Sequence, residues 1–126
     1  LLGQLQKADV RVAVITTDHR AETEETLRIL GIAHLVDLLI CGDDDLPPKP
    51  APDTLLVTCD KLGVKPARAA VVGDTVADLL MAQRAGAGLR VAVLSGVGDP
   101  ALLRAHANVV LRSIDEITLS QDFRSL

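Results

Sequence analysis

Five short apolar runs, each of strand length, alternate along this chain with longer segments that carry helical signals. The runs are residues 10–15, 35–41, 69–72, 90–94 and 109–111. Strands that are joined by helix-length connections pair in parallel, because a parallel neighbour has to be reached by a crossover. Aromatic residues make up only 1% of the chain, so Val, Leu, Ile and Ala must fill the core. The pattern predicts an α/β fold, with a Rossmann-like parallel sheet and helices on both faces.

Capping residues mark where the predicted helices begin and end. Asp53 is a candidate N-cap, and Asp99 is a second one because Pro100 follows it. Ser113 and Glu116 match the spacing of a capping box, which predicts one further helical turn. Three glycines follow helical segments and predict their C-terminal ends: Gly31, Gly63 and Gly86.

Composition narrows the classes of function. The net charge is −4 and the basic residues are scattered, so a nucleic-acid surface is not expected. No apolar run has the length of a membrane span, and no secretory leader is visible. Cys41 and Cys59 lack metal-ligand spacing and are predicted to be reduced thiols in a cytoplasmic protein. Residues 1–126 are interpreted as a single domain.

Two carboxylates follow the apolar run at residues 69–72. Gly73 allows a tight turn, and Asp74 and Asp78 come directly after it. If a helix begins after Thr75, the four-residue spacing places both carboxylates near the end of the strand. Like charges this close repel each other, and a hard cation such as Mg²⁺ would relieve the repulsion. The alternative is that Asp74 only caps the turn and that Asp78 is a solvated helix residue.

Four other residues are candidates for binding an anion. Thr16 ends the run at residues 10–15, so its hydroxyl could donate to a phosphate oxygen, together with the backbone N–H groups of Thr17 and Asp18. Lys49 lies in a loop that four prolines stiffen, and such a lysine could bind a phosphate as a point charge. The alternatives are a threonine that caps the turn and a surface lysine in a stiff linker.

In this order along the chain, these segments closely resemble the motifs of the haloacid dehalogenase-like hydrolases. The similar branch of that family includes the phosphoglycolate phosphatases and β-phosphoglucomutase. Residues 12–16 match the family's second motif, residues 49–53 the third and residues 71–78 the fourth, and residues 85–87 close the next helix as in the family. The resemblance extends over about residues 1–117.

The resemblance implies a Mg²⁺-dependent phosphatase that hydrolyses phosphomonoesters through an aspartyl-phosphate. It implies that Thr16 and Thr17 bind the phosphoryl group and that Lys49 steadies the nucleophile and the phosphate. Asp74 would be a Mg²⁺ ligand, and Asp78 would be either a ligand or a partner of the ligands. The expected substrate is a small phosphorylated metabolite, whose identity the sequence does not specify.

One departure from the family is large. The family's first motif, a strand that ends in Asp-x-Asp and supplies the nucleophile, is absent, and so is the helical cap. Residues 43–45 are acidic, but they follow the wrong strand and match the family's ordinary acidic loop. The chain is therefore interpreted as the C-terminal part of a core domain, without the central first strand and inactive by itself. The alternative function is a non-catalytic fragment that binds phosphate and Mg²⁺ or serves as an interaction module.

The absent strand has a structural consequence in the family's fold. It would lie between the strands predicted at residues 10–15 and 69–72. Its loss predicts either a re-paired sheet or an exposed gap that another copy fills, and unpaired edges favour association into a homodimer. A receiver or flavodoxin-like domain shares the fold class, but its acidic cluster would precede the threonine and the lysine.

Overall fold

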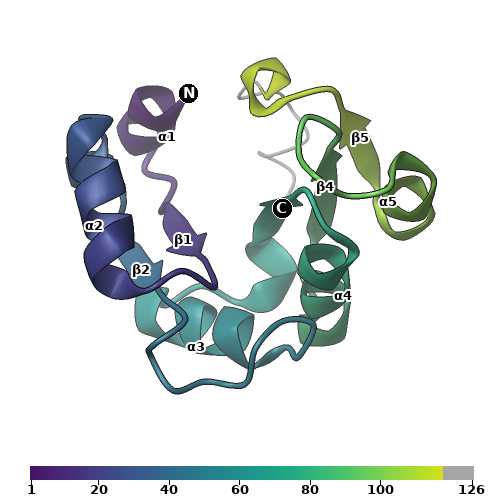
Figure 1. Ribbon diagram of the computed structural model, residues 1–126, viewed down its shortest axis with the longest axis horizontal. Helices are drawn as coiled ribbons and strands as arrows, with labels where there is room; N and C mark the ends of the chain where they lie inside the picture. Colours follow the sequence, from purple (N-terminus) through teal and green to yellow (C-terminus); the bar gives the residue numbers. More distant parts are fainter. Residues whose placement is uncertain (118–126) are drawn as a thin grey trace.

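The computed structural model describes residues 1–117, which fold into helices and two parallel sheets (Figure 1). The α-helices are α1 (Leu2–Lys7), α2 (Arg20–Ile29), α3 (Asp53–Leu62), α4 (Val76–Ala85) and α5 (Pro100–His106). The strands are β1 (Ala13–Ile15), β2 (Leu38–Ile40), β3 (Ala70–Gly73), β4 (Leu89–Val93) and β5 (Val109–Leu111). Short 3₁₀ turns are η1 (Ala33–Leu35), η2 (Pro66–Arg68) and η3 (Ile114–Glu116). The predicted domain, 1–126, includes residues 118–126, which lie outside the described part.

The strands pair only in parallel within the described residues, which confirms the α/β Rossmann-like fold class. β1 pairs with β2, with Val14 opposite Leu39. The second sheet has the order β3-β4-β5, with Ala92 of β4 opposite Val110 of β5. Across residues 1–117, β1 and β3 do not pair with each other. A re-paired single sheet is therefore the wrong alternative, and the open arrangement is the one observed.

Helices α3 and α4 connect the two sheets at their base (Figure 1). Ile15 of β1 and Val71 of β3 both pack against one buried cluster, formed by Leu55, Cys59, Met81, Ala82 and Ala85. Full burial of a leucine or methionine side chain, such as Leu55 or Met81 in this cluster, stabilises a fold by about 1.5–3 kcal/mol. The shared cluster therefore fixes the two sheets relative to each other although no backbone hydrogen bond joins them.

A second cluster covers β4. Leu79 of α4, Ala92 of β4 and Leu103 of α5 are each fully buried and pack together. Leu79 follows Asp78 directly in the chain, so the packing of α4 on this cluster also fixes the start of the helix. The cluster therefore holds the residues that follow β3 in a defined position.

Two predictions about the strands need correction. The run at residues 69–72 was expected to be buried, but Val72 of β3 is 37% exposed. The run at residues 10–15 forms a strand only from Ala13, and Val10 is 39% exposed. Both differences have the same cause, because β1 and β3 each have a strand neighbour on one side only. An unpaired edge neither extends a strand nor covers its side chains.

The predicted helix boundaries hold with two exceptions. Asp53 is not the N-cap but the first residue of α3, because the N-cap is Pro52, whose carbonyl accepts from Leu56 N–H. The capping box after residue 112 is incomplete, since the Glu116 carboxylate accepts from Arg112 N–H instead of from the N-cap Ser113. The three predicted terminal glycines all have a left-handed φ between 67° and 80°: Gly31, Gly63 and Gly86.

Two further findings concern the predicted setting of the protein. No helix among residues 1–117 combines the length and the apolar character needed to cross a membrane. Cys41 and Cys59 are free and buried, and burial raises the pKa of both thiols. Both side chains are therefore protonated and unreactive at neutral pH.

Candidate functional site

Thr75 and Asp78 form a reciprocal cap at the start of α4. The Thr75 hydroxyl accepts from Asp78 N–H at 3.3 Å and donates to Asp78 Oδ2 at 2.9 Å. The same carboxylate oxygen accepts from Thr75 N–H at 3.2 Å. The sequence places these groups three residues apart, which is the spacing that a capping box requires. Asp78 is only 7% exposed, so the alternative of a solvated helix residue is wrong.

Lys49 contacts the second oxygen of this carboxylate. Its Nζ lies 2.6 Å from Asp78 Oδ1, and the two side chains are 16% and 11% exposed. A surface lysine in a stiff linker is therefore excluded. The Asp78 carboxylate accepts from one cation and from two donors of Thr75, so both of its oxygens are already hydrogen-bonded. Asp78 thus neutralises Lys49 and orients its ammonium group.

Asp74 is less constrained. It is half-buried, and its Oδ2 accepts from Val97 N–H at 3.4 Å, a long contact. Among the described residues, no other side-chain hydrogen bond reaches this carboxylate. A Cβ placed on Gly96 would overlap the carboxylate of Asp74, and one on Gly98 would overlap its backbone carbonyl. The loop after β4 therefore packs its bare backbone against Asp74 and leaves the second carboxylate oxygen available.

Thr16 stands where the sequence predicts, at the end of β1. Its backbone N–H donates to the carbonyl of Ile40 at 3.0 Å, which continues the pairing with β2. Its hydroxyl accepts from Asp18 N–H at 3.1 Å, so Thr16 does cap its own turn. The Asp18 N–H is thereby removed from the predicted anion donors. The proton of the Thr16 hydroxyl can still be donated, and Thr17 is exposed beside it.

Contacts between neighbouring loops place these residues along one edge of the molecule. Gly42, after β2, approaches the end of β1 so closely that a Cβ would overlap the carbonyl of Thr17. The ion pair of Lys49 with Asp78 joins the β2–α3 loop to the end of β3. The loop after β4 packs in turn on the end of β3. The carboxyl ends of parallel strands are where ligands bind in α/β sheets.

The donor set at this edge fits one weakly held Mg²⁺ ion. Residues 1–117 contain no group of three or more His, Cys, Asp or Glu that could hold a metal. Asp78 is already paired, which leaves Asp74 as the carboxylate that can accept a cation. Mg²⁺ commonly binds through one or two carboxylates and keeps several waters. Asp74 with water and a phosphate oxygen would meet that preference.

Two of the three carboxylates in the acidic loop after β2, those of Asp43 and Asp44, make structural contacts, whereas Asp45 is exposed. Asp43 Oδ1 accepts from the backbone N–H of Arg20 at 3.0 Å. Asp44 Oδ2 accepts from Cys41 N–H at 2.7 Å and from Arg20 Nη2 at 2.5 Å. The hydrogen bond from Cys41 and then the guanidinium of Arg20 lower the pKa of Asp44. These hydrogen bonds and the ion pair favour a structural role for Asp43 and Asp44 over a nucleophilic one, as we expected from the sequence.

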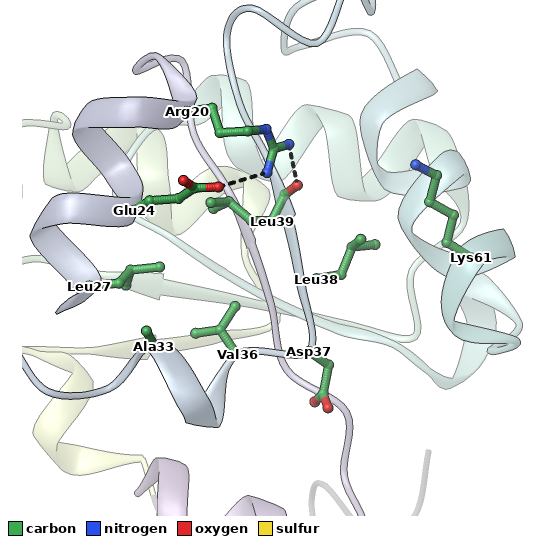
Figure 2. Close-up of a pocket in the computed structure, with 9 residues that line it drawn as sticks. All are labelled: Arg20, Glu24, Leu27, Ala33, Val36, Asp37, Leu38, Leu39 and Lys61. Carbon is green, nitrogen blue, oxygen red and sulfur yellow. Dashed lines mark hydrogen bonds and ion pairs between the residues drawn. The ribbon is translucent and has the colours of Figure 1, made fainter.

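A cavity of about 460 Å³ lies beside β2, between residues of α2, η1 and β2 (Figure 2). Apolar side chains of α2 and β2 form much of its wall, and its charged members are Arg20, Glu24, Asp37 and Lys61. None of the site residues predicted from the sequence lines it. The cavity is therefore not the site to which the motifs point.

Comparisons with known proteins agree with the motifs. A family model of haloacid dehalogenase-like hydrolases matches residues 1–86. Validoxylamine A 7'-phosphate phosphatase of Streptomyces hygroscopicus subsp. limoneus is 37% identical over 117 residues, which cover 93% of this chain and 54% of that protein. A phosphoglycolate phosphatase of Neisseria meningitidis serogroup A is 35% identical over 102 residues, which cover 81% of this chain and 43% of that protein.

The fold agrees as well. A haloacid dehalogenase-like hydrolase from Bacteroides fragilis superposes with a TM-score of 0.85 at 26% identity, over 93% of this chain and 56% of that one. The chain thus spans about half the length of the relatives that it matches. The resemblance predicted from the motifs at the ends of β1 and β3 is confirmed. The chain belongs to the haloacid dehalogenase-like hydrolases, in the branch that contains the phosphoglycolate phosphatases.

Proposed function

We propose that this chain carries the phosphate-binding, lysine and magnesium-binding parts of a phosphatase that acts on a small phosphorylated metabolite. The observation that carries the proposal is the contact of Lys49 with Asp78 beside the less constrained Asp74. That contact brings the Lys49 ammonium to Asp78, four residues after Asp74. Phosphatase relatives support the same reaction class.

Each residue has a distinct role in this proposal. Asp74 would hold Mg²⁺, which when bound neutralises charge on the phosphate oxygens. Lys49, oriented by Asp78, supplies a second positive charge from the β2–α3 loop. Thr16 donates its hydroxyl proton to a phosphate oxygen, and the backbone N–H of Thr17, an exposed residue, adds a second donor.

The reaction implied for the complete enzyme passes through an aspartyl-phosphate. A carboxylate oxygen attacks phosphorus and forms an acyl phosphate while the bond from phosphorus to the ester oxygen breaks. The ester oxygen takes a proton from a general acid and leaves as the alcohol. Water then attacks phosphorus, releases inorganic phosphate and restores the carboxylate. Asp43 and Asp44 are held by Arg20 and Cys41, which leaves them unsuited to be that nucleophile. We therefore infer that the nucleophile is supplied from outside residues 1–117 and that this chain alone has negligible turnover.

Calorimetry and a hydrolysis assay test the proposal together. We expect wild-type chain to bind Mg²⁺ weakly and Asp74→Asn to lose that binding. Asp60→Asn, an exposed carboxylate on α3, removes the same charge as a matched control and should bind as wild type does. With p-nitrophenyl phosphate and Mg²⁺, no hydrolysis above the blank is expected. Turnover by the wild-type chain that Asp74→Asn abolishes would contradict the inferred need for an outside nucleophile.

The alternative function is a non-catalytic module that binds phosphate and Mg²⁺. It is favoured by the hydrogen bonds that hold Asp43 and Asp44 to Arg20 and Cys41, which leave these two carboxylates unsuited to act as nucleophiles. The two functions differ in their response to a supplied nucleophile segment. Adding the N-terminal half of the Neisseria relative as a separate polypeptide should restore hydrolysis if the chain is part of an enzyme. Binding of that segment without hydrolysis would favour the non-catalytic module.

We also propose that the chain associates as a homodimer in the cytoplasm. The unpaired edges of β1 and β3 within residues 1–117 support association, because open strand edges are templates for pairing. The buried free thiols of Cys41 and Cys59 suit a reducing compartment. Light scattering on the purified chain should give twice its mass of 13.3 kDa. A monomer at all concentrations would contradict the dimer.

A further inference from the structure

Arg20 joins two loops of the candidate site although it belongs to neither the metal nor the phosphate ligands proposed above. It is the first residue of α2, four positions after Thr16. Its Nη2 donates to the carbonyl oxygen of Leu39 at 2.8 Å and to Asp44 Oδ2 at 2.5 Å. Figure 2 shows the guanidinium reaching from α2 to β2 and joined to Leu39 by a dashed line. One side chain therefore crosses from the β1–α2 turn to β2 and the loop that follows it.

Backbone contacts reinforce this connection. The N–H of Arg20 donates to Asp43 Oδ1 at 3.0 Å, and the N–H of Gly42 donates to the carbonyl of Asp18 at 2.7 Å. A Cβ on Gly42 would overlap the carbonyl of Thr17. The β1–α2 turn and the start of the β2–α3 loop thus meet without side chains between them. Their relative position is set by directional hydrogen bonds rather than by apolar packing.

The Asp44 carboxylate completes the arrangement. Its Oδ2 accepts from Cys41 N–H at 2.7 Å as well as from Arg20. Charge-assisted hydrogen bonds of this kind are about twice as strong as neutral ones and restrict the geometry of a guanidinium. Glu24 lies farther away, 3.8 Å from Arg20 Nη1, and contributes little positioning. Asp44 is therefore the anchor for the side chain of Arg20.

The same helix offers a comparison for this ion pair. Arg28 and Glu25 also pair through charge-assisted hydrogen bonds, but their side chains are 70% and 54% exposed. They are three residues apart on one helix and connect no loops. Arg20 and Arg28 thus both form an ion pair with a carboxylate, but only the pair of Arg20 connects two loops.

We propose that Arg20 and Asp44 form a clamp that positions Thr16 and Thr17 relative to Lys49 for the binding of a phosphate group. The inference rests on the proposed function, because it takes these three residues as the phosphate site. Lys49 follows Asp44 by five positions in the same loop, so the clamp fixes the lysine side and the threonine side of the site to each other. Arg20 and Asp44 are positioning residues and do not touch phosphate.

Titrations with inorganic phosphate and, separately, with Mg²⁺ test the clamp, followed by amide shifts in ¹H–¹⁵N spectra of the full chain. Asp44→Asn and Glu25→Gln each remove one negative charge, so simple electrostatics predicts slightly tighter phosphate binding for both. The clamp instead predicts that Asp44→Asn weakens phosphate binding about fivefold. Arg20→Lys, which keeps the charge, should weaken it similarly. Glu25→Gln should match wild type, and Mg²⁺ affinity should stay within about twofold throughout.

The outcomes separate the clamp from the proposed function and from simple loss of stability. A variant that merely unfolds in part would lose phosphate and Mg²⁺ binding together, which would overturn a positioning role. Asp43→Asn keeps an oxygen that accepts from Arg20 N–H and should stay folded and bind phosphate normally. If wild type binds phosphate and Asp44→Asn binds it equally well, the clamp is refuted and the proposed function stands. If wild type shows no shift at Thr16 or Thr17 with phosphate, the proposed function fails and the clamp fails with it.

Discussion

Replacing Lys49 with methionine tests whether the ion pair at the start of α4 stabilises the fold. The substitution keeps an unbranched side chain of similar length but removes the ammonium group 2.6 Å from Asp78 Oδ1. The Asp78 carboxylate, whose side chain is 11% exposed beside Lys49, then has Thr75 as its remaining hydrogen-bond donor. The free energy of unfolding should therefore fall by the cost of an uncompensated charge, reduced by the two remaining hydrogen bonds.

The magnitude follows from the distance and the burial. Unit charges 2.6 Å apart attract by about 6 kcal/mol at an effective dielectric constant of about 20. Desolvation of both groups offsets much of this attraction. Exposed pairs contribute about 0–1 kcal/mol, whereas breaking a buried pair costs about 3–5 kcal/mol. With side chains 16% and 11% exposed, Lys49→Met should cost about 2–3 kcal/mol. At this chain length the melting temperature should fall by about 8–12 °C.

Urea and thermal unfolding, followed by circular dichroism, measure the effect in a double-mutant cycle. Lys49→Met, Asp78→Ala and the double variant should give a coupling energy of about 2 kcal/mol. Lys65→Met, at an exposed lysine, is the matched control and should change stability by less than about 0.5 kcal/mol. A coupling energy near zero, with Lys49→Met as stable as the control, would refute the reasoning about this pair.

Three further predictions follow from the described contacts. Gly96→Ala should weaken Mg²⁺ binding and lower the free energy of unfolding by about 1–3 kcal/mol, because the added Cβ overlaps the Asp74 carboxylate. Calorimetry measures the Mg²⁺ affinity, and urea unfolding measures the stability. The lowered pKa of Asp44 means that its stabilising contribution is present above about pH 3.9 and is lost as the pH falls below it. Asp44→Asn should thus lose less stability than wild type between about pH 5 and pH 3. Cys41 and Cys59 should react with a thiol reagent only upon unfolding, since burial raises both pKa values.

The first two of these three predictions have a matched control variant of the same chain. Gly3→Ala adds a Cβ with nothing within 4 Å and should leave Mg²⁺ binding unchanged. Glu25→Gln removes a carboxylate on the surface of α2 whose pKa is lowered by Arg28. The stability of this variant as the pH falls shows the effect of losing an exposed ion pair, for comparison with Asp44→Asn. Equal Mg²⁺ affinity in both glycine variants, parallel acid curves for wild type and Asp44→Asn, or rapid thiol labelling of the folded chain would each contradict the corresponding prediction.

Local sequence signals predicted the elements whose causes are local. The sequence predicted that α4 starts after Thr75 and ends at Gly86, which has a left-handed φ of 80°. The reciprocal cap of Thr75 with Asp78 was not predicted, although the two residues are only three positions apart. Asp53 failed as an N-cap because the carbonyl of Pro52 already accepts the first helical hydrogen bond. That choice depends on how the preceding proline-rich loop enters the helix, which no short motif encodes.

Contacts between segments that are far apart in the chain could not be predicted from the sequence. In the sequence, Gly42 and Gly96 resemble ordinary loop glycines, yet each lies against a residue more than 20 positions away in the chain. No short motif predicted the contacts of Arg20, whose guanidinium the structure places on Asp44 and Leu39. The exposure of Val72 likewise follows from which strands pair, a property of the whole sheet.

The central claim is that the ends of β1 and β3 form a single phosphate site that includes a metal. The most direct measurement is the affinity for inorganic phosphate with and without Mg²⁺, in wild type and in Asp74→Asn. The account predicts that Mg²⁺ tightens phosphate binding, that amides at Thr16 and Val97 shift together, and that Asp74→Asn abolishes the enhancement. Phosphate binding that is independent of Mg²⁺, or an enhancement that survives in Asp74→Asn, would contradict it.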